Sequence, residues 1–136
     1  MSGISAIALS GMNAAARRLD VSASNVANVA SSGTLPESDG TVPAGAPQAY
    51  VPLQVVQTDI AGGGTQTDVS SVRPSSVASF DPQAPFANQD GLVASPNVDL
   101  STELVSQLVA RYSFAANALV MKADNEMSQT LIDTVA

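Results

Sequence analysis

The last part of the chain, after Pro96, contains no proline and no glycine. Apolar side chains recur there every three or four positions, the spacing that keeps residues on one face of an α-helix. They are Val105, Val109, Tyr112, Ala116, Leu119, Ala123, Met127, Leu131 and Val135. A helix over 98–136 would be roughly 55 Å long, whereas a compact globule of this size has a radius of gyration of about 14 Å. The pattern therefore predicts a helix that is longer than its own domain and must pack against neighbouring elements or molecules.

A second helix is predicted over residues 4 to about 30. Apolar positions again step by three and four, at Ile4, Ala8, Met12, Ala15, Leu19, Ala23, Val26 and Ala30. Gly11 inside it costs about 1 kcal/mol relative to alanine, which indicates close packing or local flexibility. Gly33 is well suited to a left-handed cap after the helix.

Residues 34–97 have a different composition, because all eight prolines and most of the glycines lie between Gly33 and Pro96. Short strands are predicted within 49–58, 65–72 and 75–80, forming a small β-hairpin or three-stranded sheet. The run Gly62-Gly63-Gly64 is typical of a hairpin turn. A phosphate-binding loop is the alternative, but neither a helix nor a lysine follows it.

Acidic residues border the loop before the long helix. Asp81 and Asp90 lie beside proline and glycine, so turn formation is favoured over a loop ion site. Asp99 is placed to cap the helix, with Glu103 in its first turn where the helix dipole favours negative charge.

Two proline-free helices around this middle predict a mainly α fold. Long antiparallel N- and C-terminal helices, resembling a coiled coil, would flank a small β-hairpin and loop-rich segment. The expected units are an N-terminal helix over 1–33, the middle domain over 34–97 and a C-terminal helix over 98–136. The two helices would form an assembly core.

Aligning the helix ends makes opposed residue numbers sum to about 138 to 142. Met12 would then lie near Met127, and Leu19 near Leu119. Arg17 and Arg18 would lie near Asp124 and Glu126, and Asn25 and Asn28 would approach Arg111, Tyr112 and Asn117. Either these polar residues are solvated, or they form a buried cluster that selects partner and register.

A pair of helices cannot bury all of this apolar surface. Leu104, Leu108, Ala115, Ala118 and Met121 lie off the main stripe and widen the apolar face. Since no further helix is predicted, the missing partners must be other subunits. Contacts that run head to tail without closing produce helical filaments.

Composition disfavours several classes of function. The net charge of −7 opposes binding to nucleic-acid phosphates. The chain has no cysteine and no histidine, so disulfides, thiolate catalysis, the commonest general base and the commonest metal ligands are missing. No cofactor, metal or enzymatic activity is expected. The N-terminus lacks the pattern of a cleaved signal peptide, and no stretch has the ~20 apolar residues that span a bilayer.

Short motifs stand at both ends of the chain. Near the N-terminus they comprise Asn25, Ala27, Asn28 and Gly33, and in the last helix Arg111-Tyr112, Asn117, Ala123-Asp124 and Met127. Together with the stretch 81–98, these motifs resemble those of the bacterial flagellar basal-body rod and hook proteins. The N-terminal residues fit the asparagine- and glycine-containing family signature, from which Ser24 and Ala30 depart, and the C-terminal series is similar to the family's closing helix.

The resemblance implies a non-enzymatic structural subunit of the proximal rod, the drive shaft that crosses the periplasm. The subunit would polymerise through its terminal helices and be exported by the flagellar type III apparatus without a cleaved signal peptide. Its partners would be copies of itself, other rod proteins and the basal-body base or export gate. The expected helix-pairing and subunit-interface residues are Leu19, Asn25, Ala27, Asn28, Gly33, Leu108, Arg111, Tyr112, Asn117, Leu119, Met127 and Leu131. The alternative is a periplasmic or secreted helical-hairpin adaptor or chaperone, which would be a stable monomer or a small closed oligomer.

Overall fold

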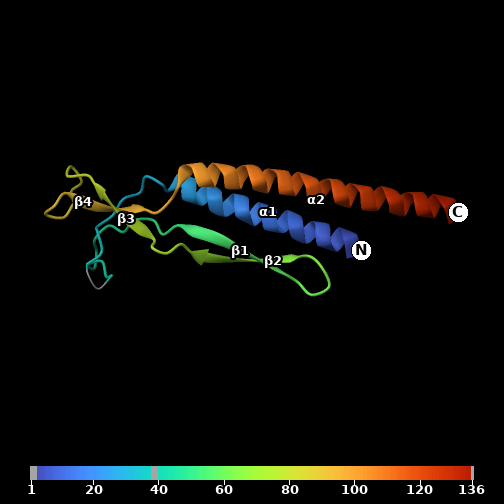
Figure 1. Cartoon of the computed structure of the whole chain (residues 1–136), viewed down its shortest axis with the longest axis horizontal. Coiled ribbons are helices and arrows are strands. Elements are labelled where there is room, and N and C mark those ends of the chain that lie inside the picture. The colour runs from blue at the N-terminus through green and yellow to red at the C-terminus, as the bar shows by residue number, and fades with distance from the viewer. Residues whose placement is uncertain (1–2, 38–39, 136) are drawn as a thin grey trace.

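The computed structural model describes residues 3–37 and 40–135, with the side chain of Val135 outside the described part. The elements follow in the order α1 (Gly3–Ala27), β1 (Leu53–Asp59), β2 (Thr65–Ser71), β3 (Ser76–Phe80), β4 (Leu92–Pro96) and α2 (Leu100–Val135). Figure 1 shows α1 and α2 side by side, with both chain ends at one end of the molecule and the β3–β4 hairpin at the other. The predicted fold of long antiparallel helices around a small β-containing middle is confirmed.

The start of α2 is capped as predicted. The Thr102 amide donates to Asp99 Oδ1 at 2.8 Å, and the Glu103 amide donates to the Asp99 carbonyl at 3.0 Å. The first bond satisfies an amide that otherwise has no partner within the helix, and the second is the first bond of the helix itself. With no proline or glycine after this point, α2 continues for 36 residues.

The end of α1 differs from the prediction. The helix stops at Ala27, and the Asn28 side chain turns back to donate to the Ser24 carbonyl at 2.8 Å. Gly33 is not a left-handed cap, since its φ is not positive. Instead Gly33 forms a β-bridge with Ala94, with both backbone bonds at 2.9 Å.

Gly33 is required by close approach rather than by a special φ. A Cβ at this position would overlap the backbone nitrogen of Ala49 and lie 2.7 Å from the Pro47 carbonyl oxygen. We call the Gly33–Ala94 bridge and the chain crossing at Pro47–Ala49 the neck. The neck ties the start and the end of the middle segment together close to the helices.

The strands among the described residues form separate antiparallel pairs rather than one three-stranded sheet. β1 pairs with β2 from Leu53 opposite Ser71 to Asp59 opposite Thr65, and the triple glycine turns between them with positive φ at each glycine. β3 pairs with β4, from Ser76 opposite Pro96 to Phe80 opposite Leu92. The sequence prediction missed β4, because its five residues follow Gly91, end on Pro96 and read as a linker. In the loop before β4, the Gln83 amide donates to Asp81 Oδ1 at 3.3 Å, which supports the turn role of Asp81.

The seam between α1 and α2 is built from small and polar side chains. Buried residues of α1 include Ser5, Ala8, Ala14, Ala15, Val21, Ser22 and Asn25, and buried residues of α2 are Ala110 and Asp124. Gly11 allows the helices to approach closely, since a Cβ there would lie 2.5 Å from Asn117 Oδ1. This contact explains the glycine inside α1.

The predicted helix register is wrong. Asn25 Nδ2 donates to Glu103 Oε1 at 2.6 Å, and Ser5 Oγ donates to Asp124 Oδ2. Opposed residue numbers therefore sum to 128 at the first pair and 129 at the second. The prediction aligned the free ends of the helices, whereas the structure aligns the ends that adjoin the middle segment.

The contacts that depended on the predicted register are absent among the described residues. Met12 is not opposite Met127, nor Leu19 opposite Leu119. The basic pair Arg17 and Arg18 does not meet Asp124 and Glu126. Instead Arg18 donates to Gln57 Oε1 at 3.1 Å, and Glu126 pairs with Lys122 at 3.7 Å on the surface of α2.

Candidate assembly interface

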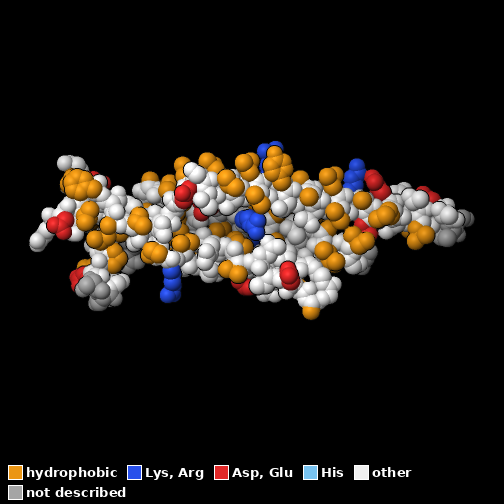
Figure 2. All heavy atoms as spheres, in the orientation of Figure 1, with side chains coloured by type: hydrophobic (Ala, Val, Ile, Leu, Met, Phe, Trp, Pro, Cys, Tyr) orange, Lys and Arg blue, Asp and Glu red, His pale blue; other side chains and the backbone are white. Residues whose placement is uncertain are grey.

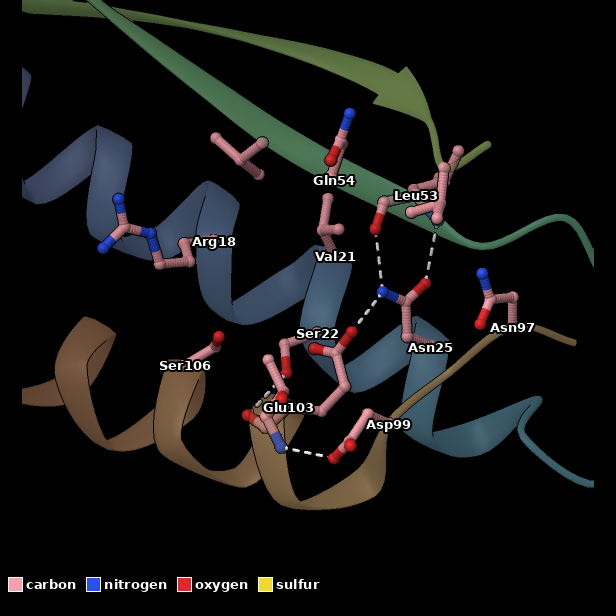
Figure 3. Close-up of a pocket in the computed structure, with 13 residues that line it drawn as sticks. Arg18, Val21, Ser22, Asn25, Leu53, Gln54, Asn97, Asp99, Glu103 and Ser106 are labelled. Atoms are coloured by element: carbon pink, nitrogen blue, oxygen red, sulfur yellow. Dashed lines mark hydrogen bonds between the residues drawn. The ribbon is translucent and has the colours of Figure 1, made fainter. Parts of the chain in front are cut away.

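Asn25 is the joint between the helices and the middle segment (Figure 3). Its side chain is 2% exposed. Its amide nitrogen donates to the Leu53 carbonyl at 2.8 Å and to Glu103 Oε1 at 2.6 Å. Its amide oxygen accepts from the Leu53 amide at 3.0 Å and from the Tyr50 hydroxyl at 3.1 Å. One side chain thus holds α1, β1 and α2 together.

A cleft of about 360 Å³ lies around this joint. Its wall includes Asn25, Glu103, Asn97 and Asp99, and Ser22 Oγ donates to the Glu103 carbonyl at 3.1 Å. Among the described residues, no group of three or more histidine, cysteine or acidic side chains could hold a metal ion. All four of these side chains form hydrogen bonds with other parts of the same chain, so the cleft has a structural role.

The predicted buried polar cluster exists with different members. Asn25 is buried as proposed, but its partners are Tyr50, Leu53 and Glu103 rather than Arg111, Tyr112 and Asn117. The other two asparagines bond within their own segments, Asn28 to Ser24 and Asn117 to the Ser113 carbonyl at 2.8 Å. The signal for the true partner was the acid in the first turn of α2, since a carboxylate facing an amide side chain satisfies both groups.

The apolar stripe of α2 points away from α1. The face of α2 toward α1 is instead formed by buried or half-buried Glu103, Ser106, Ala110, Ser113, Asn117 and Asp124. Every residue of the stripe from Val105 to Leu131 is exposed. The expectation that the apolar stripes of the two helices would pack against each other within one chain is therefore wrong.

The exposure on this outer face is large. Tyr112 is 71% exposed, Leu119 67% and Leu131 66%. Figure 2 shows hydrophobic side chains gathered along the outer edge of α2. Contiguous apolar surface of this kind marks an interaction site in a soluble protein.

An apolar groove runs beside the seam of the helices and has a volume of about 670 Å³. It is lined by Ala15, Ala16, Leu19, Leu104, Gln107, Leu108, Ala110, Arg111 and Phe114. Three residues expected at an interface, Leu19, Leu108 and Arg111, meet in this groove. We call this surface the seam groove.

The remaining predicted residues are spread over several places. Tyr112, Leu119, Met127 and Leu131 lie on the outer side of α2, where each is more than half exposed among the residues that the structure describes. Ala27 is the exposed last residue of α1. Asn25 forms the joint, Gly33 the neck and Asn117 part of the seam, whereas Asn28 bonds back to Ser24 just after α1.

Two family models match the helical parts of the chain. Residues 6–33 match the model described as "Flagella basal body rod protein". Residues 89–134 match the model described as "Flagellar basal body rod FlgEFG protein C-terminal". These segments contain all the residues for which an interface role was predicted.

Curated relatives match almost the whole chain. The flagellar basal-body rod protein FlgC of Escherichia coli O6:H1 is 33% identical over 121 residues, covering 89% of this chain and 87% of the relative. The chain belongs to the flagellar basal-body rod protein family. FlgC of Salmonella typhimurium is 32% identical with the same coverage, and FlgC of Agrobacterium fabrum is 29% identical over 98% of this chain and 94% of its own.

This membership makes the rod protein a structural subunit of the flagellar basal body, and the matches give the adaptor or chaperone alternative no support. In the described part of the chain, no helix is long and apolar enough to cross a membrane.

Proposed function

We propose that the subunit polymerises into the rod through the outer face of α2 and the seam groove. The observation that carries this proposal is the direction of the apolar stripe. A helix that is apolar on a face its own chain does not cover is stabilised by burying that face against a neighbour. At roughly 25 cal/mol per Å² of apolar surface, a stripe of this length is a substantial driving force for assembly.

The partners in this proposal are further copies of the chain, other rod proteins and the basal-body base or export gate. The location is the periplasmic rod, reached by flagellar export without a cleaved signal peptide. Family membership supports these assignments. All of these assignments require a subunit whose exposed apolar helix faces are buried only in the assembly.

The proposal assigns no enzymatic activity to the chain. The two acids at the seam, Glu103 and Asp124, accept hydrogen bonds from Asn25 and Ser5. These bonds commit both carboxylates to structure. Without histidine or cysteine in the sequence, general-base and nucleophilic roles would have to come from less suited side chains.

The test compares Leu119→Ser with Val56→Ser in the full chain. Both residues are exposed, but Leu119 lies on the stripe whereas Val56 lies on β1. Leu119→Ser is expected to abolish oligomers in sizing experiments while leaving the circular dichroism of the monomer unchanged. Val56→Ser should assemble normally. Normal assembly of Leu119→Ser would contradict the proposal.

A further inference from the structure

The β1–β2 hairpin lies along α1. Figure 1 shows it running beside the helix, with its turn toward the N-terminus. Both strands pack against α1, whereas neither packs against α2 among the described residues. Side chains of α1 bond the hairpin at three levels: Asn25 at Leu53, Arg18 at Gln57 and Ser10 at Thr65. The helix therefore has α2 on one side and the hairpin on another.

Two neighbouring alanines lie on these different sides of α1. Ala14 and Ala15 are equally buried, each being 6% exposed. Ala14 is four residues from both Ser10 and Arg18, which bond the hairpin, so it shares their side of the helix. Ala15 lines the seam groove together with residues of α2. The hairpin therefore accounts for the burial of Ala14, and α2 for that of Ala15.

The base of the hairpin is firmly held. Asn25, itself 2% exposed, bonds both backbone polar groups of Leu53. The neighbouring side chain of Pro52 is fully buried, and the Pro52 carbonyl accepts from the Val72 amide at 2.8 Å. These contacts fix both strands where the hairpin joins the rest of the middle segment.

The tip of the hairpin is held by a hydroxyl group. Ser10 Oγ accepts from the Thr65 amide at 3.1 Å and donates to the Ile7 carbonyl at 2.7 Å. The turn approaches the helix closely, since a Cβ at Gly63 would lie 2.8 Å from Ile7 Cδ1. We call the contact between Ser10 and Thr65 the clasp. Opening the clasp breaks one hydrogen bond, whereas the base is held by several.

Little side-chain burial joins the hairpin to α1 between these two ends. Every residue of β1 and β2 is exposed or half-buried. A two-stranded hairpin is marginally stable by itself, and segments with few buried apolar contacts open more easily than the core of a protein. The attachment is therefore strong at the base and weak at the tip.

We propose that the β1–β2 hairpin is a strap that opens at the clasp and turns about its base. The bonds of Asn25 stay closed, and α1 stays paired with α2. Opening uncovers the side of α1 around Ala14, so this surface can be covered or uncovered without unfolding the helical pair. The inference goes beyond the proposed function, because it concerns the free subunit and requires no partner.

Two backbone amides report on the opposite ends of the strap. The Thr65 amide is bound by Ser10 at the clasp, and the Leu53 amide by Asn25 at the base. Hydrogen exchange is followed by NMR on the unaltered full-length monomer. After correction for intrinsic rates, the Thr65 amide should exchange about tenfold faster than the Leu53 amide, or more. Equal protection of the two amides would overturn the hinge at the base.

Thiol labelling measures the opening on the helix. The chain has no native cysteine, so Ala14→Cys and Ala15→Cys each supply one reporter, equally buried but covered by different elements. With a small thiol reagent, the Ala14→Cys thiol should react about tenfold faster than the Ala15→Cys thiol. Equal rates would mean that the hairpin does not open separately from α2, and would overturn the strap. The exchange experiment remains decisive if a cysteine disturbs the packing, since it uses the unaltered chain.

Removing the clasp should increase the opening. Ser10→Ala should raise the labelling rate of Ala14→Cys about three- to tenfold and leave that of Ala15→Cys unchanged. Ser128→Ala, at an exposed position on α2, is the matched control and should change neither rate. An unchanged rate at Ala14→Cys would show that the clasp does not hold the strap, and an equal increase at both thiols would show general loosening. Either result would overturn the proposal.

Discussion

Asn25 Nδ2 lies 2.6 Å from Glu103 Oε1, and this bond joins the end of α1 to the first turn of α2. Because the same amide group also binds both backbone polar groups of Leu53, the helices are aligned from the end that carries the middle segment. The longer helix must then project at the other end. A local polar contact thus determines which end of α2 is left without α1 beside it.

Replacing Asn25 with alanine should lower the free energy of unfolding by about 2–4 kcal/mol. The change would leave the Leu53 amide and carbonyl, Tyr50 and Glu103 without their shared partner. Urea denaturation measures the loss. Asn13→Ala, an exposed position on the same helix, serves as the control and should change stability by less than about 0.5 kcal/mol. Equal effects of the two substitutions would contradict the role of Asn25 as the joint.

Alanine at Gly33 should destabilise the neck by about 3 kcal/mol, since there is no room for a Cβ beside backbone atoms of Ala49 and Pro47. Gly3→Ala is the matched control, because nothing lies within 4 Å of a Cβ at that helical position. It should be neutral or stabilising by up to about 1 kcal/mol. Thermal unfolding of the two variants gives the comparison, and a mild effect at Gly33 would show that the neck can move apart.

Removing the cap of α2 with Asp99→Ala should cost about 1 kcal/mol, because the Thr102 amide loses its acceptor. Asp99→Asn should recover most of this loss, since asparagine also accepts from that amide. Chemical denaturation measures both variants. A loss in Asp99→Asn as large as that in Asp99→Ala would mean that the negative charge, rather than the capping bond, carries the effect.

Leu131→Ser should separate stability from assembly. The side chain is 66% exposed, so the free energy of unfolding of the monomer should change by less than about 0.5 kcal/mol. Oligomer formation should weaken strongly, because a buried leucine at the proposed contact would be lost. Analytical ultracentrifugation at several concentrations measures this effect. A destabilised monomer would show instead that Leu131 packs within its own chain.

Much of the fold could be predicted from local patterns. The helical spacing and the lack of proline and glycine predicted α2, and Asp99 predicted its start. The triple glycine predicted the turn after Asp59. Each of these features depends on residues that are close together in the chain, so a single sequence is enough to predict it.

The pairing of the helices could not be predicted in the same way. Matching apolar faces assumes that each chain buries its own hydrophobic surface, and in this protein serine, alanine, glycine and asparagine form the seam instead. The apolar stripe from Val105 to Leu131 is left for contacts outside the chain. Prediction also missed β4, because its pairing with β3 and the bridge from Ala94 to Gly33 join residues that are distant in the sequence.

The neck also determines where the protein tolerates change. Since the bonds between Gly33 and Ala94 close the middle segment at its base, added residues in the β3–β4 loop would not alter the path of either helix. The entropy of closing such a loop grows slowly, by about 0.6 kcal/mol for each doubling of its length. The loop from Asp81 to Gly91 is thus the natural place to insert a tag or a fluorescent domain without disturbing the helical pair.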